Sequence, residues 1–267
     1  MRSPTSPAAP SPAATLVLIR DRLEGSPEVL LIQRHAASRF AAGDFVFPGG
    51  KVEAEDLPAN ADACCAGITD DQAKARLGDI GSARLALGHW IGAIREAFEE
   101  VGILMAYDRE GRLVRLTGAE REKFAAYRRR CQEDGSVFWR MLREEHLTLA
   151  TDRLIYFAHW ITPEESPVRF DTRFFAAEAP AGQDAVADEL EIVGIRWLTP
   201  AEGVEARRRG ELPLRFPTVK NLGLLQGRSA AEVLAGLESR TVPAIRPRVL
   251  TVDGTPRVLL PTDPGWY

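Results

Sequence analysis

The segment IREAFEEVGIL (Ile94–Leu104) places three glutamates, Glu96, Glu99 and Glu100, beside a run of apolar residues with no lysine among them. On a helix that turns about 100° per residue, the apolar side chains gather on one face and predict an ordinary buried surface. The glutamates fall together on the opposite face, with Arg95 on their flank. Glu96 and Glu100 are like charges four residues apart, a spacing that costs a helix roughly a few tenths of a kcal/mol. Two interpretations follow: a solvated acidic face, or a cluster neutralised by a hard divalent cation with oxygen ligands.

The whole chain has the composition of a soluble globular protein. Its 267 residues are 45% hydrophobic and 27% charged, and the formal net charge is −4. This mild acidity argues against a broad nucleic-acid or membrane surface. The three cysteines are odd in number and lack metal-site spacing, which agrees with a reducing compartment. We therefore expect a cytoplasmic protein with neither a nucleic-acid nor a membrane partner.

The order of elements predicts a single α/β domain over residues 15–267, preceded by a disordered tail over residues 1–14 that is rich in Pro, Ser and Ala. Residues 200–267 are expected to supply C-terminal helices and a closing hairpin with Asp253–Gly254 as its turn. The expected strands are Ala14–Arg20, Glu28–Arg34, Leu154–Ile161, Arg169–Ala177 and Leu190–Pro200, and Asp44–Gly50 is expected to be a short strand that runs into a Pro-Gly-Gly loop. Besides the acidic segment, the expected helices are Asp70–Leu77, Ala119–Glu145, Thr218–Leu225 and Ala230–Ser239.

The order of a strand, the loop FPGG (Phe47–Gly50), Asp56 and the acidic segment resembles the box that defines the Nudix hydrolases, G-x5-E-x7-R-E-U-x-E-E-x-G-U, where U is bulky and apolar. Asp56 stands at the position of the first glutamate, and a much longer segment than usual separates it from Arg95. One branch of the family, similar to the peroxisomal coenzyme A diphosphatase, carries an insertion here. That branch also shows WITP followed by RFDTRFF, as this chain does from Trp160 and from Arg169. The resemblance implies an α/β/α Nudix sandwich with a mixed sheet, and we expect residues 57–88 to be a polar surface excursion within the box.

The resemblance also implies an enzyme that hydrolyses a phosphorus-containing anhydride, the diphosphate of a nucleoside derivative, with Mg2+ or Mn2+. The implied metal ligands are Glu96, Glu99, Glu100 and the carbonyl of Gly49. Glu99 could instead act as the base on the attacking water, and Arg95 would orient the glutamates through its planar fork. Gly50 would let the backbone approach the ion and substrate closely. Glu191, six residues before Trp197, stands where a catalytic glutamate often lies in this family, although a solvated loop charge is the alternative.

Residues 30–50 align without a gap on the coenzyme A diphosphatase motif LLTxRSxxLRxHxGxxxFPGG, and nine of its 13 defined positions agree, whereas Ile32, His35, Ser38 and Ala41 differ. Within this segment Arg34 and Arg39 would meet substrate phosphates, unless they are ordinary surface arginines. Coenzyme A or acyl-CoA is the first substrate candidate, cleaved to 3′,5′-ADP and the 4′-phosphopantetheine product. NADH, ADP-ribose and nucleotide sugars are rivals, and a non-catalytic Nudix-like ligand-binding module is the alternative from another class. The expected partner is a small-molecule diphosphate, and the assembly state stays open, with a homodimer as one alternative.

Overall fold

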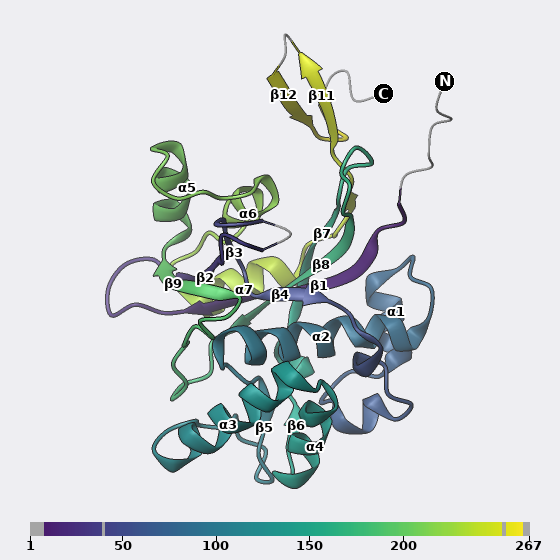
Figure 1. Ribbon diagram of the computed structural model, residues 1–267, viewed down its shortest axis with the longest axis vertical. Helices are drawn as coiled ribbons and strands as arrows, with labels where there is room; N and C mark the ends of the chain where they lie inside the picture. The colour runs from purple at the N-terminus through teal and green to yellow at the C-terminus, as the bar shows by residue number, and fades with distance from the viewer. Residues whose placement is uncertain (1–7, 39–40, 253–254, 264–267) are drawn as a thin grey trace.

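A mixed β-sheet of eight strands forms the centre of the computed structural model, which describes residues 8–38, 41–252 and 255–263 (Figure 1). The strand order is β10-β7-β8-β1-β2-β3, with β4 paired to β1 and β9 paired to β2. The central strand β1 pairs in parallel with β8 and antiparallel with β2 and β4. The strand bounds are β1 Ser11–Arg20, β2 Glu28–Arg34, β3 Phe45–Val46, β4 Gly49–Lys51, β7 Ile155–Ile161, β8 Phe170–Glu178, β9 Ile192–Leu198 and β10 Ala244–Ile245.

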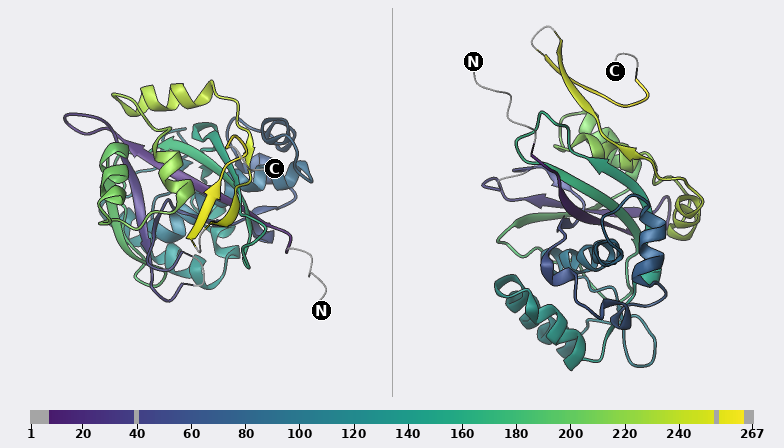
Figure 2. Two further views of the ribbon diagram at one scale, coloured as in Figure 1. Left: turned by 90° about the horizontal axis from the view of Figure 1, so that it is seen from above. Right: turned by 90° about the vertical axis from the view of Figure 1, so that its right-hand side faces the viewer.

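Helices cover both faces of this sheet (Figures 1 and 2). One face carries α1 Asp70–Leu77, α2 Ala83–Val101, α3 Ala119–Glu133 and α4 Ser136–Glu144, and the other carries α5 Pro200–Arg208, α6 Phe216–Leu222 and α7 Ala230–Glu238. Each face has its own apolar cluster, because alternate residues of the strands point to opposite sides. Short 3-10 helices lie at η1 Ala54–Asp56, η2 Ala61–Cys64 and η3 Thr151–Arg153. Two small two-stranded sheets pair β5 Ala106–Tyr107 with β6 Thr148–Leu149 and β11 Arg248–Val252 with β12 Thr255–Leu259. The expected α/β/α sandwich is confirmed.

The strand β1 is apolar over most of its length because the sheet buries both of its faces. Leu16, Val17, Leu18 and Ile19 are all 0% exposed. Leu16 and Leu18 belong to the cluster beneath α2, whereas Val17 and Ile19 belong to the opposite cluster. A continuous apolar run is the pattern expected of a strand that is covered on two sides.

The helix α2 starts eleven residues before the acidic segment. The side chain of Ser82 accepts a hydrogen bond from the Leu85 N–H at 3.1 Å, which caps the first turn. Gly102 ends the helix with φ +72°, and its N–H donates to the carbonyl of Phe98. Because only glycine adopts this left-handed conformation without strain, the glycine after EEV sets the end of α2.

Several boundaries differ from the sequence predictions. β1 begins at Ser11, so residues 11–14, expected in a disordered tail, belong to the sheet, where Ser11 pairs beside Phe170; residues 1–7 lie outside the described part. The helix expected over Ala119–Glu145 is two helices, because Asp134–Gly135 interrupt it. The turn expected at Asp253–Gly254 lies outside the described residues, whereas α1 has the predicted bounds.

The segment 57–88 is more than a surface excursion, which corrects the expectation from its polar composition. Ile68, Ala73 and Leu77 are at most 7% exposed and belong to the apolar cluster beneath α2. Alanine-rich helices can bury a narrow face while their other residues stay in water, and α1 does so against α2. Within the described part of the chain, none of the helices combines the length and the apolar character that crossing a bilayer requires.

Candidate active site

The glutamates of α2 do not form a solvated face. Glu100 is 4% exposed, and the side chains of Glu96 and Glu99 are each 15% exposed. The apolar residues Ile94, Ala97 and Phe98 on the other side of the helix are buried against the sheet as predicted. The carboxylates therefore lie in a partly enclosed layer between α2 and the loop that follows β3, and the first of the two sequence interpretations is wrong.

Arg95 is the hub of this layer because all three nitrogens of its guanidinium group contact oxygen acceptors. Its Nε donates to Asp56 Oδ1 at 2.8 Å and its Nη2 donates to Asp56 Oδ2 at 3.0 Å, a two-point pair with side chains 7% and 0% exposed. Nη2 also donates to the carbonyl of Lys51 at 3.0 Å. Nη1 donates to Glu99 Oε2 at 2.8 Å and lies 3.0 Å from Glu96 Oε1. The planar fork therefore orients two of the three glutamates and ties them to the 3-10 helix η1.

Two helical glycines allow Asp56 to reach Arg95 across the insertion. A Cβ added to Gly88 would lie 2.3 Å from Leu57 Cδ2, and one added to Gly92 would lie 3.0 Å from Asp56 Oδ2. The bare surface of α2 at these positions lets η1 and the residue after it pack against the helix. The long segment between Asp56 and Arg95 thus leaves the site and returns to it without separating the two charges.

Gly49 and Gly50 lie directly against Glu100 and Glu96. The N–H of Gly49 donates to Glu100 Oε2 at 2.8 Å. A Cβ on Gly50 would lie 2.5 Å from Glu96 Oε1, and a Cβ on Gly49 would lie 2.4 Å from the carbonyl oxygen of Ala14. At Gly49 the backbone of β1 leaves no room for a side chain, whereas a side chain at Gly50 would have to displace the carboxylate of Glu96.

Arg34, at the end of β2, enters the same site from the opposite side. Its Nη1 donates to Glu100 Oε1 at 3.2 Å, and its Nη2 lies 3.5 Å from Glu191 Oε2. Glu191 keeps 66% of its side chain exposed, so this second contact is a loose one. The predicted phosphate-binding arginine thus lies among the glutamates, whereas Arg39 falls outside the described residues.

Three polar residues that the sequence analysis did not single out hold this arrangement from outside. Arg128 Nε and Gln132 Nε2, both on α3, donate to the carbonyl of Glu99 at 2.9 Å each. Asp188 Oδ1 accepts the backbone N–H groups of residues 190, 191 and 192 and so fixes the loop that carries Glu191. The sequence signal for Asp188 is an aspartate just before a strand, where its side chain can accept from the following N–H groups; helix α3 offers no comparable local signal.

Burial disfavours the ionised form of all three glutamates. Burial, only partly offset by Arg95, raises the pKa of Glu96 to about 7. Burial raises the pKa of Glu99 as well, and burial together with the charge of Glu96 holds the pKa of Glu100 well above its ordinary value. A carboxylate cluster with raised pKa values is one that an added cation would stabilise.

The carboxylates of this site suit a hard divalent cation that takes its other ligands from water and substrate. In residues 8–38, 41–252 and 255–263, no three or more His, Cys, Asp or Glu side chains are grouped so that they could hold a metal ion together. Magnesium characteristically takes one or two carboxylates and completes its shell with water and substrate phosphates. Glu96 and Glu100, one turn apart and beside the Gly49–Gly50 backbone, fit that requirement.

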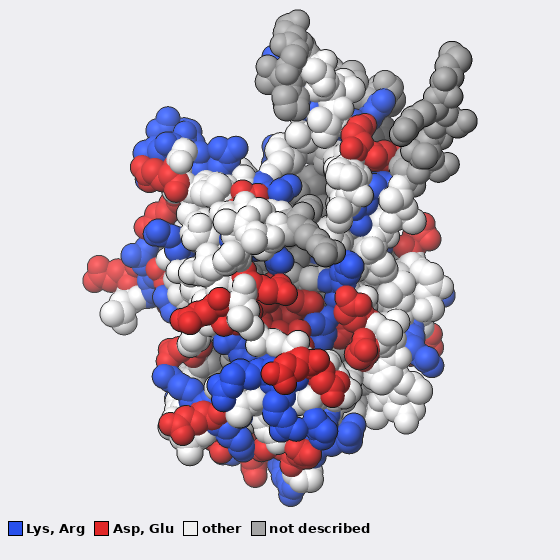
Figure 3. Space-filling view, in the orientation of Figure 1, with Lys and Arg blue, Asp and Glu red and all other residues white. Residues whose placement is uncertain are grey.

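Acidic side chains form one zone on this face of the molecule, and a second zone mixes basic and acidic side chains (Figure 3). Figure 3 shows acidic side chains gathered near the middle of the face, and many Lys and Arg side chains below them, where α3 and α4 lie in Figure 1. The acidic zone coincides with the end of α2 described above. A ligand that bridges the zones would place a cation against the first and an anionic group against the second.

Comparisons with known proteins identify relatives of this arrangement. The family model described as the NUDT19 Nudix domain matches residues 66–225. The chain is 30% identical over 209 residues to a Xenopus laevis protein named acyl-coenzyme A diphosphatase NUDT19, an alignment covering 67% of this chain and 54% of that protein. The human protein of the same name is 28% identical over 298 residues, covering 97% of this chain and 74% of that one.

A solved structure supports the same relationship at the level of the fold. The crystal structure of a NUDIX hydrolase from Alicyclobacillus acidocaldarius matches with a TM-score of 0.66 and 26% sequence identity. The match covers 85% of this chain and 92% of that protein. The chain spans about half the length of the frog relative.

Proposed function

The chain belongs to the Nudix hydrolases, in the coenzyme A diphosphatase branch, and from this premise we propose that it hydrolyses the diphosphate of coenzyme A or an acyl-CoA. The products would be 3′,5′-ADP and the corresponding 4′-phosphopantetheine. Membership makes the chain an enzyme that acts on phosphorus anhydrides. The choice of coenzyme A is supported by the names of its relatives and by the residues that match the motif over 30–50.

The observation that carries the proposal is the joint placement of Gly49–Gly50, the glutamates of α2 and the Asp56–Arg95 pair. Nudix hydrolases generally use divalent metals, and we propose Glu96 and Glu100, with the Gly49 carbonyl, as the groups that would hold Mg2+ or Mn2+. The bound ion would neutralise phosphate oxygens and lower the pKa of water. Diphosphate cleavage needs little from the protein beyond positioning and charge stabilisation.

The remaining residues have distinct proposed roles. Arg95 keeps Glu96 and Glu99 oriented. The carboxylate of Asp56 balances the charge of Arg95, so the guanidinium group can remain ionised inside the protein. Glu99 or Glu191 accepts the proton of the attacking water; the side chain of Glu191 is 66% exposed, whereas Glu99 is held by Arg95. Arg34 donates to substrate phosphate oxygens from its place beside Glu100.

A comparison of substrates tests the proposal. The purified chain is incubated with coenzyme A, NADH, ADP-ribose and a nucleotide sugar at equal Mg2+ or Mn2+, and products are identified by mass. We expect the highest kcat/KM for coenzyme A or a short acyl-CoA, with 3′,5′-ADP as a product. If a rival is cleaved at least about tenfold more efficiently, a difference of about 1.4 kcal/mol, the coenzyme A assignment is wrong and only the diphosphatase assignment stands.

A non-catalytic ligand-binding module is the second candidate, and the structure speaks against it. Such modules are expected to lose the catalytic glutamates, whereas Glu96, Glu99 and Glu100 all face the glycine loop or Arg95 here. Binding of the same compounds without any product would restore this alternative.

A further inference from the structure

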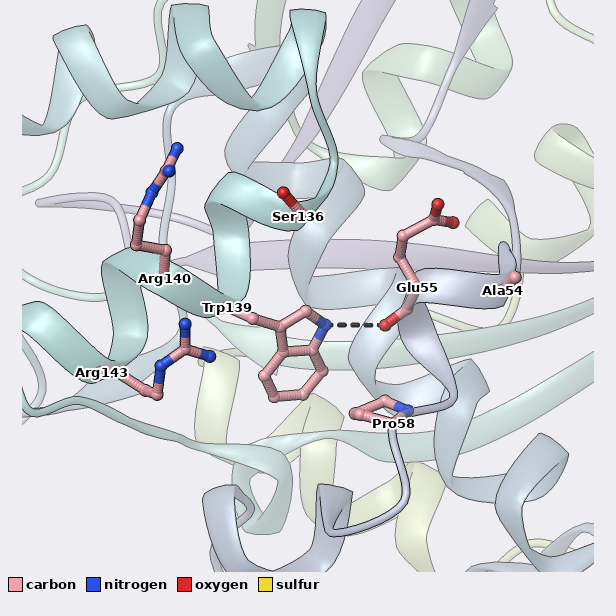
Figure 4. A pocket seen from close by; sticks show the side chains of 7 residues that line it. All are labelled: Ala54, Glu55, Pro58, Ser136, Trp139, Arg140 and Arg143. Atoms are coloured by element: carbon pink, nitrogen blue, oxygen red, sulfur yellow. Dashed lines mark hydrogen bonds between the residues drawn. The ribbon is translucent and has the colours of Figure 1, made fainter.

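A hollow of about 360 Å³ lies beside the candidate active site, between the start of the insertion and helix α4 (Figure 4). Its walls include Glu55 and Pro58 on one side and Trp139, Arg140 and Arg143 on the other. Its size is within the range of roughly 300–1,000 Å³ that is typical of small-molecule sites. None of these residues has a role in the proposed chemistry.

An aromatic ring forms the floor of this hollow and is held in place. Trp139 Nε1 donates to the carbonyl of Glu55 at 2.7 Å, so the polar edge of the indole is already satisfied. The rest of the ring, with Pro58 nearby, offers an apolar surface to a ligand. A fixed indole is a good platform for a planar base, since such stacking contributes about 1–3 kcal/mol per base.

Two guanidinium groups give the hollow a positive side. Figure 4 shows those of Arg140 and Arg143 on one side of the Trp139 ring and the Glu55 carboxylate on the other. Among the described residues neither arginine has a carboxylate within 4.0 Å, and the buried Nε of Arg140 has no hydrogen-bond partner. Guanidinium groups that line one hollow and have no carboxylate partner are suited to a phosphate group.

The hollow is coupled to the candidate active site through η1. Glu55 lines the hollow, and the next residue, Asp56, holds Arg95 and through it Glu96 and Glu99. The turn between α3 and α4 packs on the same element, because a Cβ on Gly135 would lie 3.7 Å from Glu55 Cγ. The hollow and the candidate active site therefore share the element η1.

We infer that this hollow is the subsite for the 3′-phosphoadenosine end of the substrate. The 3′-phosphate contacts Arg140 and Arg143, and the adenine packs on Trp139. This inference rests on the proposed function, since it assigns one half of coenzyme A to a place in the chain. It makes the two arginines the residues that distinguish coenzyme A from related diphosphates that lack the 3′-phosphate.

Dephospho-CoA, which differs from coenzyme A only in lacking the 3′-phosphate, provides the test. kcat/KM is measured for both compounds with the wild-type chain, with the double variant Arg140→Met and Arg143→Met, and with Arg240→Met as a control. Methionine keeps the length of the side chain and removes the charge. Arg240 is exposed and follows α7 on the opposite face of the sheet. Thermal unfolding of each variant verifies the fold.

The expected result is a loss of about tenfold or more in kcat/KM for coenzyme A in the double variant, the lower end for hydrogen bonds to a charged group. The value for dephospho-CoA should stay within about twofold, because that substrate has no 3′-phosphate for the arginines to contact. The control should change neither. Equal losses for both compounds, or no loss, would overturn the subsite while leaving coenzyme A cleavage in place.

If the wild-type chain cleaves neither compound, the proposed function fails, and calorimetric titration separates the two claims. The probes are 3′,5′-ADP and 5′-AMP, which differ in the same phosphate. Tighter binding of 3′,5′-ADP that the double variant abolishes would retain the anion subsite. Equal binding of the two nucleotides would remove it as well.

Discussion

Replacing Asp56 by asparagine should weaken the group that holds Arg95 without changing any of the proposed metal ligands. Asp56 is the buried partner of Arg95, with two hydrogen bonds of 2.8 and 3.0 Å, and it also accepts the N–H of Glu53 at 2.9 Å. An amide of the same size would place its N–H donors against the guanidinium group of Arg95, which has no acceptor for them. Breaking one partner of a buried ion pair costs about 3–5 kcal/mol, and we expect the lower end because the amide oxygen can still accept one bond.

The assay is urea unfolding followed by tryptophan fluorescence, together with kcat for the diphosphate substrate. Asp184→Asn is a matched control, because Asp184 forms its ion pair with Arg121 at the surface, where both side chains are more than half exposed. That variant should lose less than about 1 kcal/mol. Asp56→Asn should also lower kcat, since Arg95 holds Glu96 and Glu99. A stability loss below about 1 kcal/mol with unchanged kcat would refute the hub role of Arg95.

Two further predictions concern the glycine loop and a buried histidine. Gly49→Ala should lower the free energy of unfolding by about 1–3 kcal/mol, because its Cβ meets backbone of β1. Gly50→Ala should leave stability nearly unchanged and lower kcat by about a hundredfold, because its Cβ displaces only the movable end of Glu96; equal effects of the two variants on stability would contradict this. Burial lowers the pKa of His89 to about 4, so between pH 6.5 and 4 the unfolded chain binds a proton that the native chain does not. The stability that neutral His89 contributes is therefore present above pH 6.5, and the free energy of unfolding should fall by about 2 kcal/mol from pH 7 to pH 5. Urea unfolding at the two pH values should show a smaller fall for His89→Gln.

The sequence could predict the features that depend on local pattern. The helical period alone separates Ile94, Ala97 and Phe98 from the glutamates, and burial follows that division. Strands and most helices appear close to their predicted bounds because turn and capping residues act within a few positions. The family pattern brought Gly49–Gly50 and the glutamates into one hypothesis, and the structure shows the contacts between them.

Features that depend on distant packing could not be predicted in this way. The carbonyl of Glu99 accepts from Arg128 and Gln132, which are 29 and 33 residues away on another helix, and no local pattern marks such a bond. The insertion was expected at the surface because its composition is polar, yet its few apolar side chains complete the core beneath α2. Burial of Glu100 likewise depends on the loop and on Arg34, which are remote in sequence.

The most direct test of the central claim is the turnover of Glu100→Gln with coenzyme A and Mg2+. The amide keeps the shape of the side chain and removes the buried charge beside Gly49. We predict that the variant folds, as shown by circular dichroism, and that kcat falls by about a hundred- to a thousandfold, the cost of removing a preorganised charge-stabilising group. A folded Glu100→Gln protein that cleaves coenzyme A at nearly the wild-type rate would contradict the account.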